Sequence, residues 1–289
     1  MSRSIRTSFP VTGDRVVNGT IELPPSGIRN APVLLFVPGF KGFRDWGGWP
    51  WLTRAIADAG FVVHRVDLSM NGYSGRCDLQ DEEEKFAHNT FGHDLEDLDV
   101  LFDSFDRWGI PNGVASERFG IIGHSRGGIV SLLFAGEHPS IESVATLGAP
   151  ACGLSVYKEE LHDLWRESGS LEVINARTDQ TLRLDVSILE DLEENRERYD
   201  VERAVKEANL PTLVLHGSED ETVSLTDAVE LMNWLPNPRS RIEALETGHT
   251  FGFMHPFAGP DRAGEAVRDL LVQWFTDTLA DDAGDDWGG

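Results

Sequence analysis

Lysine is scarce in this sequence, and acidic residues outnumber the basic ones. The 289 residues include only four lysines, at positions 41, 85, 158 and 206, and 49 acidic residues stand against 25 lysines and arginines. The formal net charge is therefore -24. The phosphates of nucleic acids and the surfaces of anionic membranes would repel so acidic a chain. We therefore expect neither nucleic acid nor a membrane as a partner.

Cysteine and long apolar runs are also nearly absent. Cys77 and Cys152 are too few for a disulfide framework and lack the spacing of a zinc site. No run approaches the length of a membrane-spanning helix, and the N-terminal residues lack an apolar signal core. We expect a soluble, cytoplasmic protein that needs no metal or other cofactor. The acid excess is larger than solubility requires, which favours a halophilic host over an ordinary acidic enzyme.

Apolar runs alternate with amphipathic segments along most of the chain. The runs predict buried strands at residues 31–37, 61–66, 119–122, 143–147, 212–216 and 241–245. Helical spacing predicts helices at residues 52–59, 90–108, 126–137, 224–234 and 261–279. Two further strands in residues 3–23 predict an antiparallel entry. This order is typical of an α/β fold with a mostly parallel central sheet and helices on both faces.

The composition shifts between residues 151 and 209, which predicts an insertion into this core. A short hairpin is expected around Arg177, followed by a charged, helical segment over residues 187–208. An insertion after a sheet strand would lie over the carboxyl ends as a cap. We therefore expect a core of residues 1–150 and 210–280, a cap of residues 151–209, and a disordered acidic tail at 281–289.

The sequence Gly123-His124-Ser125-Arg126-Gly127 joins a predicted strand to a predicted helix. This setting is typical of a nucleophile elbow, in which a strained turn lifts the serine hydroxyl above the sheet edge. The two glycines remove side chains that would collide where the strand and the helix approach each other. Ser125 is therefore the expected nucleophile.

A serine nucleophile needs a histidine base, and that base needs an acid to orient it. His249 follows the last predicted strand directly and is the preferred base, with His255 as the weaker alternative. Asp220 follows the strand at 212–216 and is preferred over Glu219, because Val223 can anchor its loop. A structural role as a helix or turn cap remains the alternative for Asp220. Two acids of the helix at 90–108, Asp94 and Asp97, are expected to face solvent.

An oxyanion hole needs two backbone N–H donors. Arg126, the residue after the nucleophile, is expected to supply one, and Phe40, in the glycine-containing loop after the strand at 31–37, the other. Three tryptophans follow this loop, Trp46, Trp49 and Trp51, either as packing or as the lining of a substrate pocket.

From about residue 15 to 279 the chain resembles the α/β-hydrolase superfamily. The resemblance lies in the chain order Ser, Asp, His and in four segments. Within this superfamily the chain resembles the dienelactone-hydrolase-like esterases. The segments are Pro38-Gly39-Phe40-Lys41-Gly42, Gly123-His124-Ser125-Arg126-Gly127-Gly128, His216-Gly217-Ser218-Glu219-Asp220 and Gly248-His249-Thr250-Phe251. The insert at 175–180 is similar to the cap hairpin of these esterases. The resemblance implies hydrolysis of carboxylic esters or thioesters, and true dienelactone hydrolases carry cysteine where this chain has Ser125.

We therefore predict a serine hydrolase that cleaves a small-molecule carboxylic ester through an acyl-enzyme. A thioesterase is a weaker alternative, because no basic patch for coenzyme A phosphates is evident. A serine peptidase of this fold would usually carry a further domain that anchors the substrate. A catalytically silent binding protein of the same fold is the non-enzymatic alternative, and the complete set of Ser125, Asp220 and His249 argues against it.

Overall fold

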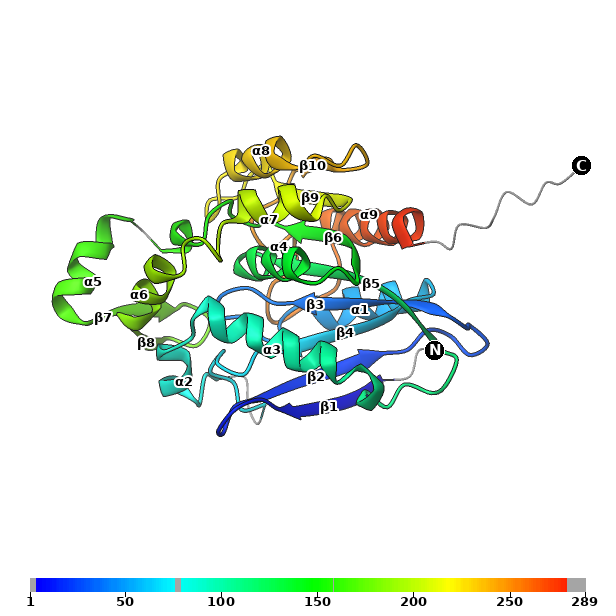
Figure 1. The fold of residues 1–289 in the computed structure, drawn as a ribbon, viewed down its shortest axis with the longest axis horizontal. Coiled ribbons are helices and arrows are strands. Elements are labelled where there is room, and N and C mark those ends of the chain that lie inside the picture. The colour runs from blue at the N-terminus through cyan, green and yellow to red at the C-terminus, as the bar shows by residue number, and fades with distance from the viewer. Residues whose placement is uncertain (1–3, 76–78, 158, 280–289) are drawn as a thin grey trace, which may run out of the picture.

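An eight-stranded sheet runs through the protein in the computed structural model, which describes residues 4–75, 79–157 and 159–279 (Figure 1). The strand order is β1-β2-β4-β3-β5-β6-β9-β10. β1, β2 and β4 pair antiparallel, and the pairs from β4 to β10 are parallel. The strands are β1 (Ser4–Pro10), β2 (Val16–Glu22), β3 (Ala31–Val37), β4 (Val62–Asp67), β5 (Ala115–His124), β6 (Ile141–Leu147), β9 (Thr212–Gly217) and β10 (Arg241–Leu245). The predicted fold, with its mostly parallel central sheet, is confirmed.

The central strands are apolar because both faces of the sheet are covered. In β3, Val33 and Leu35 join one hydrophobic cluster, and the alternate residues Leu34 and Phe36 join the other. All four side chains are fully buried. Since successive side chains of a strand point to opposite faces, a continuous apolar run is what two covered faces require. The edge strand β1 instead alternates exposed residues with buried or partly buried ones.

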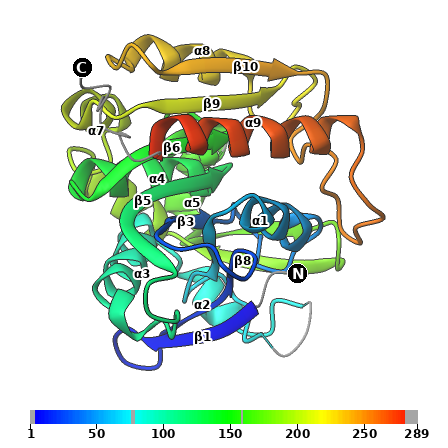
Figure 2. The ribbon, with the colours of Figure 1, turned by 90° about the vertical axis from the view of Figure 1, so that its right-hand side faces the viewer.

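Helices form a layer on each side of the sheet. α1 (Trp49–Asp58) and α9 (Arg262–Leu279) pack together on one face, where Figure 2 shows them in front of the strands. α3 (Phe91–Asp103), α4 (Arg126–Glu137) and α8 (Leu225–Trp234) cover the other face. The predicted helix at 90–108 ends earlier than expected, and a 3₁₀ turn, Phe105–Arg107, follows it. Within the described ranges, no helix is long and apolar enough to cross a bilayer.

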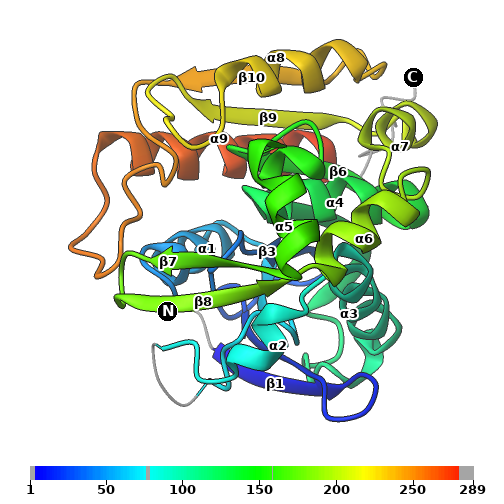
Figure 3. The same cartoon turned by 90° about the vertical axis from the view of Figure 1, so that its left-hand side faces the viewer.

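The segment between β6 and β9 lies outside the sheet, and its buried side chains join the same hydrophobic cluster as those of α3 and α4 (Figure 3). It contains α5 (His162–Ser168), the antiparallel hairpin β7 (Ser170–Asn175) and β8 (Gln180–Asp185), α6 (Ser187–Glu194) and α7 (Val201–Ala208). β8 packs against the short α2 (Glu83–Ala87). The predicted hairpin is present. The division into core and cap stays a prediction, and the tail at 281–289 lies outside the described residues.

Residues 187–208, which were expected to be charged and helical, form two helices with a break between them. α6 ends at Glu194, and α7 begins after Asp200, whose side chain accepts a hydrogen bond of 3.0 Å from the backbone N–H of Arg203. An aspartate in this position satisfies a backbone donor that the first turn of a helix leaves without a partner. Asp200 therefore starts the second of the two helices.

Asp94 and Asp97, which were expected to face solvent, are both buried. Asp97 accepts from Arg15 at 2.6 Å and from the backbone N–H of Ser69 at 2.5 Å. Asp94 accepts two hydrogen bonds from Arg126. Both carboxylates tolerate burial because an arginine from a distant part of the chain pairs with each of them.

Candidate active site

Ser125 lies in a strained turn between β5 and α4. Its backbone has φ 54° and ψ -125°, a conformation that costs a residue with a side chain on the order of 1–3 kcal/mol. A Cβ added at Gly123 would overlap the carbonyl oxygen of Gly127, and one added at Gly127 would overlap that of Pro38. Gly123 is thus needed for β5 and α4 to approach so closely, and Gly127 is needed for α4 to approach the end of β3 and the loop after it. The strand, serine and helix of the predicted elbow are all present.

His249 and Asp220 meet beside this turn. The Nδ1–H of His249 donates to Asp220 Oδ2 at 2.7 Å. The backbone N–H groups of Thr222 and Val223 donate to the other oxygen, Oδ1, at 2.8 and 2.9 Å. Burial alone would raise the pKa of Asp220, but the hydrogen bonds from His249 and the two backbone groups outweigh it and hold the pKa below the usual value. The carboxylate therefore stays ionised and fixes the Nδ1–H tautomer of His249.

Two further residues hold His249 in place. The Nε2–H of the buried His124 donates to the carbonyl oxygen of His249 at 3.0 Å, and burial lowers the pKa of His124 to about 3, so its ring is neutral. Gly148 lies against the pair: a Cβ there would come within 3.3 Å of both Asp220 Oδ2 and His249 Nδ1. Sequence reasoning missed this role of Gly148, for which the only signal was a glycine directly after a buried strand.

The weaker candidates for base and acid have other contacts. The backbone N–H of Gly47 donates to Nδ1 of His255 at 3.0 Å, and the ring of His255 stacks against Trp46. Glu219 is exposed, unlike the fully buried carboxylate of Asp220.

A cavity of about 410 Å³ connects the elbow, the loop after β3 and the hairpin turn. Its walls are Gly39, Phe40, Lys41, Gly42, Trp46, Trp49, His124, Ser125, Asn175, Ala176, Arg177, Thr222, His249 and Thr250. Trp46 and Trp49 thus line the cavity, whereas Trp51 packs against Phe253 and Phe257. Phe40 lines this cavity together with Ser125, and Arg126 is the first residue of α4, directly after Ser125. The roles of their backbone N–H groups as oxyanion donors stay predictions. In the part of the chain that the structure describes, no three His, Cys, Asp or Glu side chains gather to hold a metal.

The Arg126 side chain, for which the sequence suggested no role, is buried in a polar cluster. It pairs with Asp94 at 2.7 Å, donates to the hydroxyl of Tyr157 at 2.9 Å, and lies over the ring of Phe91. The ring of Tyr157 in turn packs edge-on against Phe40. The side chains of Phe40 and Arg126, the two predicted oxyanion donors, therefore meet at one tyrosine.

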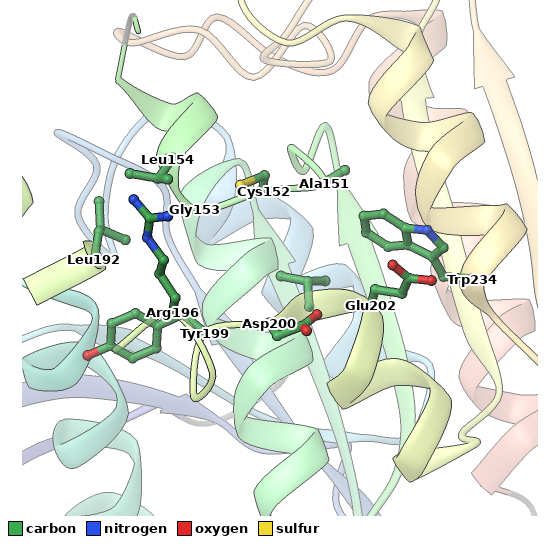
Figure 4. A pocket seen from close by; sticks show the side chains of 11 residues that line it. Ala151, Cys152, Gly153, Leu154, Leu192, Arg196, Tyr199, Asp200, Glu202 and Trp234 are labelled. Carbon is green, nitrogen blue, oxygen red and sulfur yellow. The ribbon is translucent and has the colours of Figure 1, made fainter. Parts of the chain in front are cut away.

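A second hollow, of about 270 Å³, lies between α6, α7 and α8 (Figure 4). Cys152, Arg196, Tyr199 and Trp234 are among its lining residues, and it shares none with the cavity at Ser125. The chemistry of the elbow therefore belongs to the larger cavity.

A protein-family profile matches the part of the chain that contains these site residues. The profile of the prolyl oligopeptidase family matches residues 93–282, which is more than half of the chain and includes Ser125, Asp220 and His249. No curated protein matches the chain.

Solved structures of the same fold cover nearly the whole chain. Est1E from Butyrivibrio proteoclasticus is 15% identical with a TM-score of 0.68, covering 95% of this chain and 99% of that one. A dienelactone hydrolase from Anabaena variabilis is 18% identical with a TM-score of 0.62, covering 96% and 98%. An acylaminoacyl peptidase from Pyrococcus horikoshii is 19% identical with a TM-score of 0.69, covering 96% of this chain and 42% of that one. At such identities these likenesses show the fold alone.

Together with the family match, they confirm the predicted superfamily. The chain belongs to the prolyl oligopeptidase family of serine hydrolases, within the α/β-hydrolase superfamily.

Proposed function

We propose that the protein hydrolyses small carboxylic esters through an acyl-enzyme on Ser125, with His249 as the base and Asp220 as its orienting acid. The observation that carries the proposal is the 2.7 Å hydrogen bond from His249 to Asp220, at the edge of a cavity that Ser125 also lines. A serine hydroxyl is a weak nucleophile at neutral pH until a base takes its proton. A histidine held by a buried carboxylate is suited to that task.

In the first half of the reaction, the Oγ of Ser125 bonds to the carbonyl carbon of the ester while its proton passes to Nε2 of His249. The carbonyl oxygen becomes an oxyanion, and the backbone N–H groups of Phe40 and Arg126 are the proposed donors to it. Asp220 stabilises the imidazolium that forms. The tetrahedral adduct then collapses, and the alcohol leaves with the proton that His249 held.

In the second half, water attacks the acyl group on Ser125. His249 takes a proton from the water, the carbonyl oxygen returns to the same two donors, and the proton passes to Oγ as the acid leaves. The strained backbone of Ser125 supports this role, because such strain is stored where a side chain must be aimed.

A peptidase is the second candidate, and the family match favours it. The acylaminoacyl peptidase of Pyrococcus horikoshii has the same fold, and this protein covers only 42% of that longer chain. Ester cleavage has its own support in a single cavity of about 410 Å³, a size suited to a small molecule. The esterase named Est1E has the same fold.

The test is a substrate series of p-nitrophenyl esters of increasing acyl length beside p-nitroanilides of acylated amino acids. We expect the esters to be cleaved, with Ser125→Ala lowering kcat by on the order of 10⁴-fold or more. Ser8→Ala, an exposed serine on β1, is the matched control and should keep full activity. Cleavage of the anilides with higher kcat/KM than the esters would favour the peptidase, and turnover by Ser125→Ala would refute the role of Ser125.

A further inference from the structure

The guanidinium of Arg126 is held by several partners. Its side chain is 4% exposed and forms an ion pair of 2.7 Å with Asp94 of α3. It also donates to the carbonyl oxygen of Asn89 at 3.2 Å and to the hydroxyl of Tyr157 at 2.9 Å. A planar guanidinium with this many hydrogen bonds has one favoured orientation. Since Arg126 directly follows Ser125, a side chain fixed at its far end also restrains the peptide group that carries the predicted oxyanion donor.

Tyr157 touches both residues whose backbone N–H groups are the predicted donors. Its hydroxyl accepts from Arg126, and its ring packs edge-on against Phe40 with the ring centroids 5.9 Å apart. The ring is buried and also packs edge-on against Trp165 of α5, at 5.2 Å. Tyr157 lies in the segment between β6 and β9, directly after a 3₁₀ turn, Leu154–Val156. A side chain of this segment therefore joins the loop after β3 to the first residue of α4.

The two predicted donors belong to separate elements, so their relative placement is set by what packs around them. Gly39, directly before Phe40, lies against the nucleophile, because a Cβ there would come within 2.9 Å of the Cβ of Ser125. A cavity of only about 20 Å³ is lined by Phe40, Asp94 and Arg126, so the loop after β3 packs closely onto the ion pair. Two N–H groups bind one oxyanion well only when both are aimed at it before the reaction. A contact that fixes the loop relative to Arg126 therefore bears on catalysis.

We propose that Tyr157 is a positioning residue that holds the oxyanion donors of Phe40 and Arg126 in their relative orientation. This inference rests on the proposed function and makes its rate depend on a side chain of the segment between β6 and β9. Tyr157 is not among the described residues that line the cavity at Ser125, so it acts through Phe40 and Arg126 and not on the substrate itself. Its hydroxyl anchors the residue of one donor, and its ring supports the residue of the other.

The competing explanation is that Tyr157 only stabilises the fold. Its contacts with Arg126, Phe40 and Trp165 do join three parts of the chain. The two explanations differ in what loss of the hydroxyl does. A purely structural hydroxyl contributes to stability alone, whereas a positioning hydroxyl lowers the free energy of the transition state and leaves binding of the substrate unchanged.

The first experiment compares Tyr157→Phe with the wild type on a p-nitrophenyl ester. The substitution keeps the ring that packs against Phe40 and removes the hydroxyl that accepts from Arg126. Loss of a whole oxyanion donor lowers kcat by about 100- to 1000-fold. Since here the donor is kept and only its support is weakened, we expect kcat to fall roughly 10-fold and KM to change less than about twofold.

Tyr199→Phe is the matched control. Tyr199 comes from the same segment, its hydroxyl donates to Asp191 at 3.1 Å, and its ring packs against Phe91. The control therefore removes one tyrosine hydroxyl that has a polar partner, and it leaves the contact between Tyr157 and Arg126 intact. We expect its kcat to stay within about twofold of the wild-type value. Urea unfolding establishes that both variants are folded.

A transition-state analogue gives a readout that a structural role would not move. With hexyl trifluoromethyl ketone, the Oγ of Ser125 bonds to the carbonyl carbon, its proton passes to His249, and the carbonyl oxygen becomes an oxyanion. The trifluoromethyl group does not leave, so the adduct persists and is held by the same donors. In Tyr157→Phe we expect the inhibition constant of the ketone to rise by the factor by which kcat/KM falls. The matching secondary alcohol, which forms no oxyanion, should bind within about twofold of its wild-type affinity.

A folded Tyr157→Phe variant with wild-type kcat and an unchanged inhibition constant for the ketone would overturn the inference. So would a lower kcat without a matching rise in that constant, or equal losses of kcat in Tyr157→Phe and Tyr199→Phe. Labelling of Ser125 by a fluorophosphonate in the wild type separates this failure from that of the proposed function. If Ser125 reacts and esters are cleaved, only the role of Tyr157 is wrong. If Ser125 is unreactive and no ester is cleaved, the serine-hydrolase proposal fails, and the role of Tyr157 fails with it.

Discussion

Replacing Asp220 with asparagine is the most informative single change in the site, because the backbone decides how the new side chain must lie. Two backbone N–H groups, of Thr222 and Val223, point at Oδ1. An amide placed with its NH₂ toward them would set donor against donor. The amide oxygen must therefore take that position, and the NH₂ group must face His249.

This orientation forces the wrong tautomer on the base. Nδ1 of His249 would have to accept from the NH₂ group, so the ring proton would move to Nε2, where a lone pair is needed to receive the proton of Ser125. Catalysis by a triad in this state is typically lower by about 10⁴-fold, or about 5 kcal/mol of barrier. The overall fold should persist, since the two backbone hydrogen bonds to the side chain are kept.

The assay is kcat on a p-nitrophenyl ester at neutral pH, with urea unfolding to establish that the variant is folded. Glu219→Gln is the control, since this exposed neighbour should retain activity within about twofold. A folded Asp220→Asn variant with near wild-type kcat would refute the argument. Loss of activity in Glu219→Gln instead would move the assignment to Glu219.

Three further predictions concern stability. Asp94→Ala should lower the free energy of unfolding by about 3–5 kcal/mol, because it leaves the buried Arg126 without its counter-charge, whereas Tyr157→Phe should lower it by only about 1 kcal/mol. Urea titration measures both losses. A loss below about 0.5 kcal/mol for Asp94→Ala, which is typical of a surface site, would contradict the buried ion pair. Burial lowers the pKa of His64 to about 3, so below about pH 6.5 the unfolded chain binds a proton that the folded chain does not, and stability is lost as the pH falls. His64→Gln should reduce that slope, by up to about 1.4 kcal/mol per pH unit, and equal slopes in urea titrations from pH 7 to 4 would count against the neutral buried ring. If the net charge of -24 reflects a halophilic host, the melting temperature should rise between low and molar salt, and an unchanged value would end that proposal.

The sheet could be predicted because its signal is local and repeated. The strand predicted from the apolar run at 31–37 has the same bounds in the structure, since a strand that is covered on both faces has no solvent-facing position for a polar residue. The turn at Ser125 could also be predicted, because glycines at positions 123 and 127 flank the serine in a recognisable pattern. Gly123 is required by contacts with the following turn, whereas Gly127 is required by the distant loop after β3. The structure also brings Asp220 and His249 into contact, as their chain order suggested, while their catalytic roles stay predictions.

The buried ion pairs could not be predicted, because each depends on a partner far along the chain. Asp94 pairs with Arg126 and Asp97 with Arg15. On helical spacing alone, an acid beside the apolar stripe of α3 looks like part of its solvent face. The break between α6 and α7 was missed for another reason: Asp200 is a good helix start, but a charged run around it resembles one continuous solvated helix.

The central claim is that Ser125 is an activated nucleophile, and a fluorophosphonate probe followed by peptide mapping tests it most directly. The account predicts one label, on the peptide that contains Ser125, lost in Ser125→Ala and strongly slowed in Asp220→Asn. A folded wild-type protein that takes up no label, or one labelled at another serine, would contradict it.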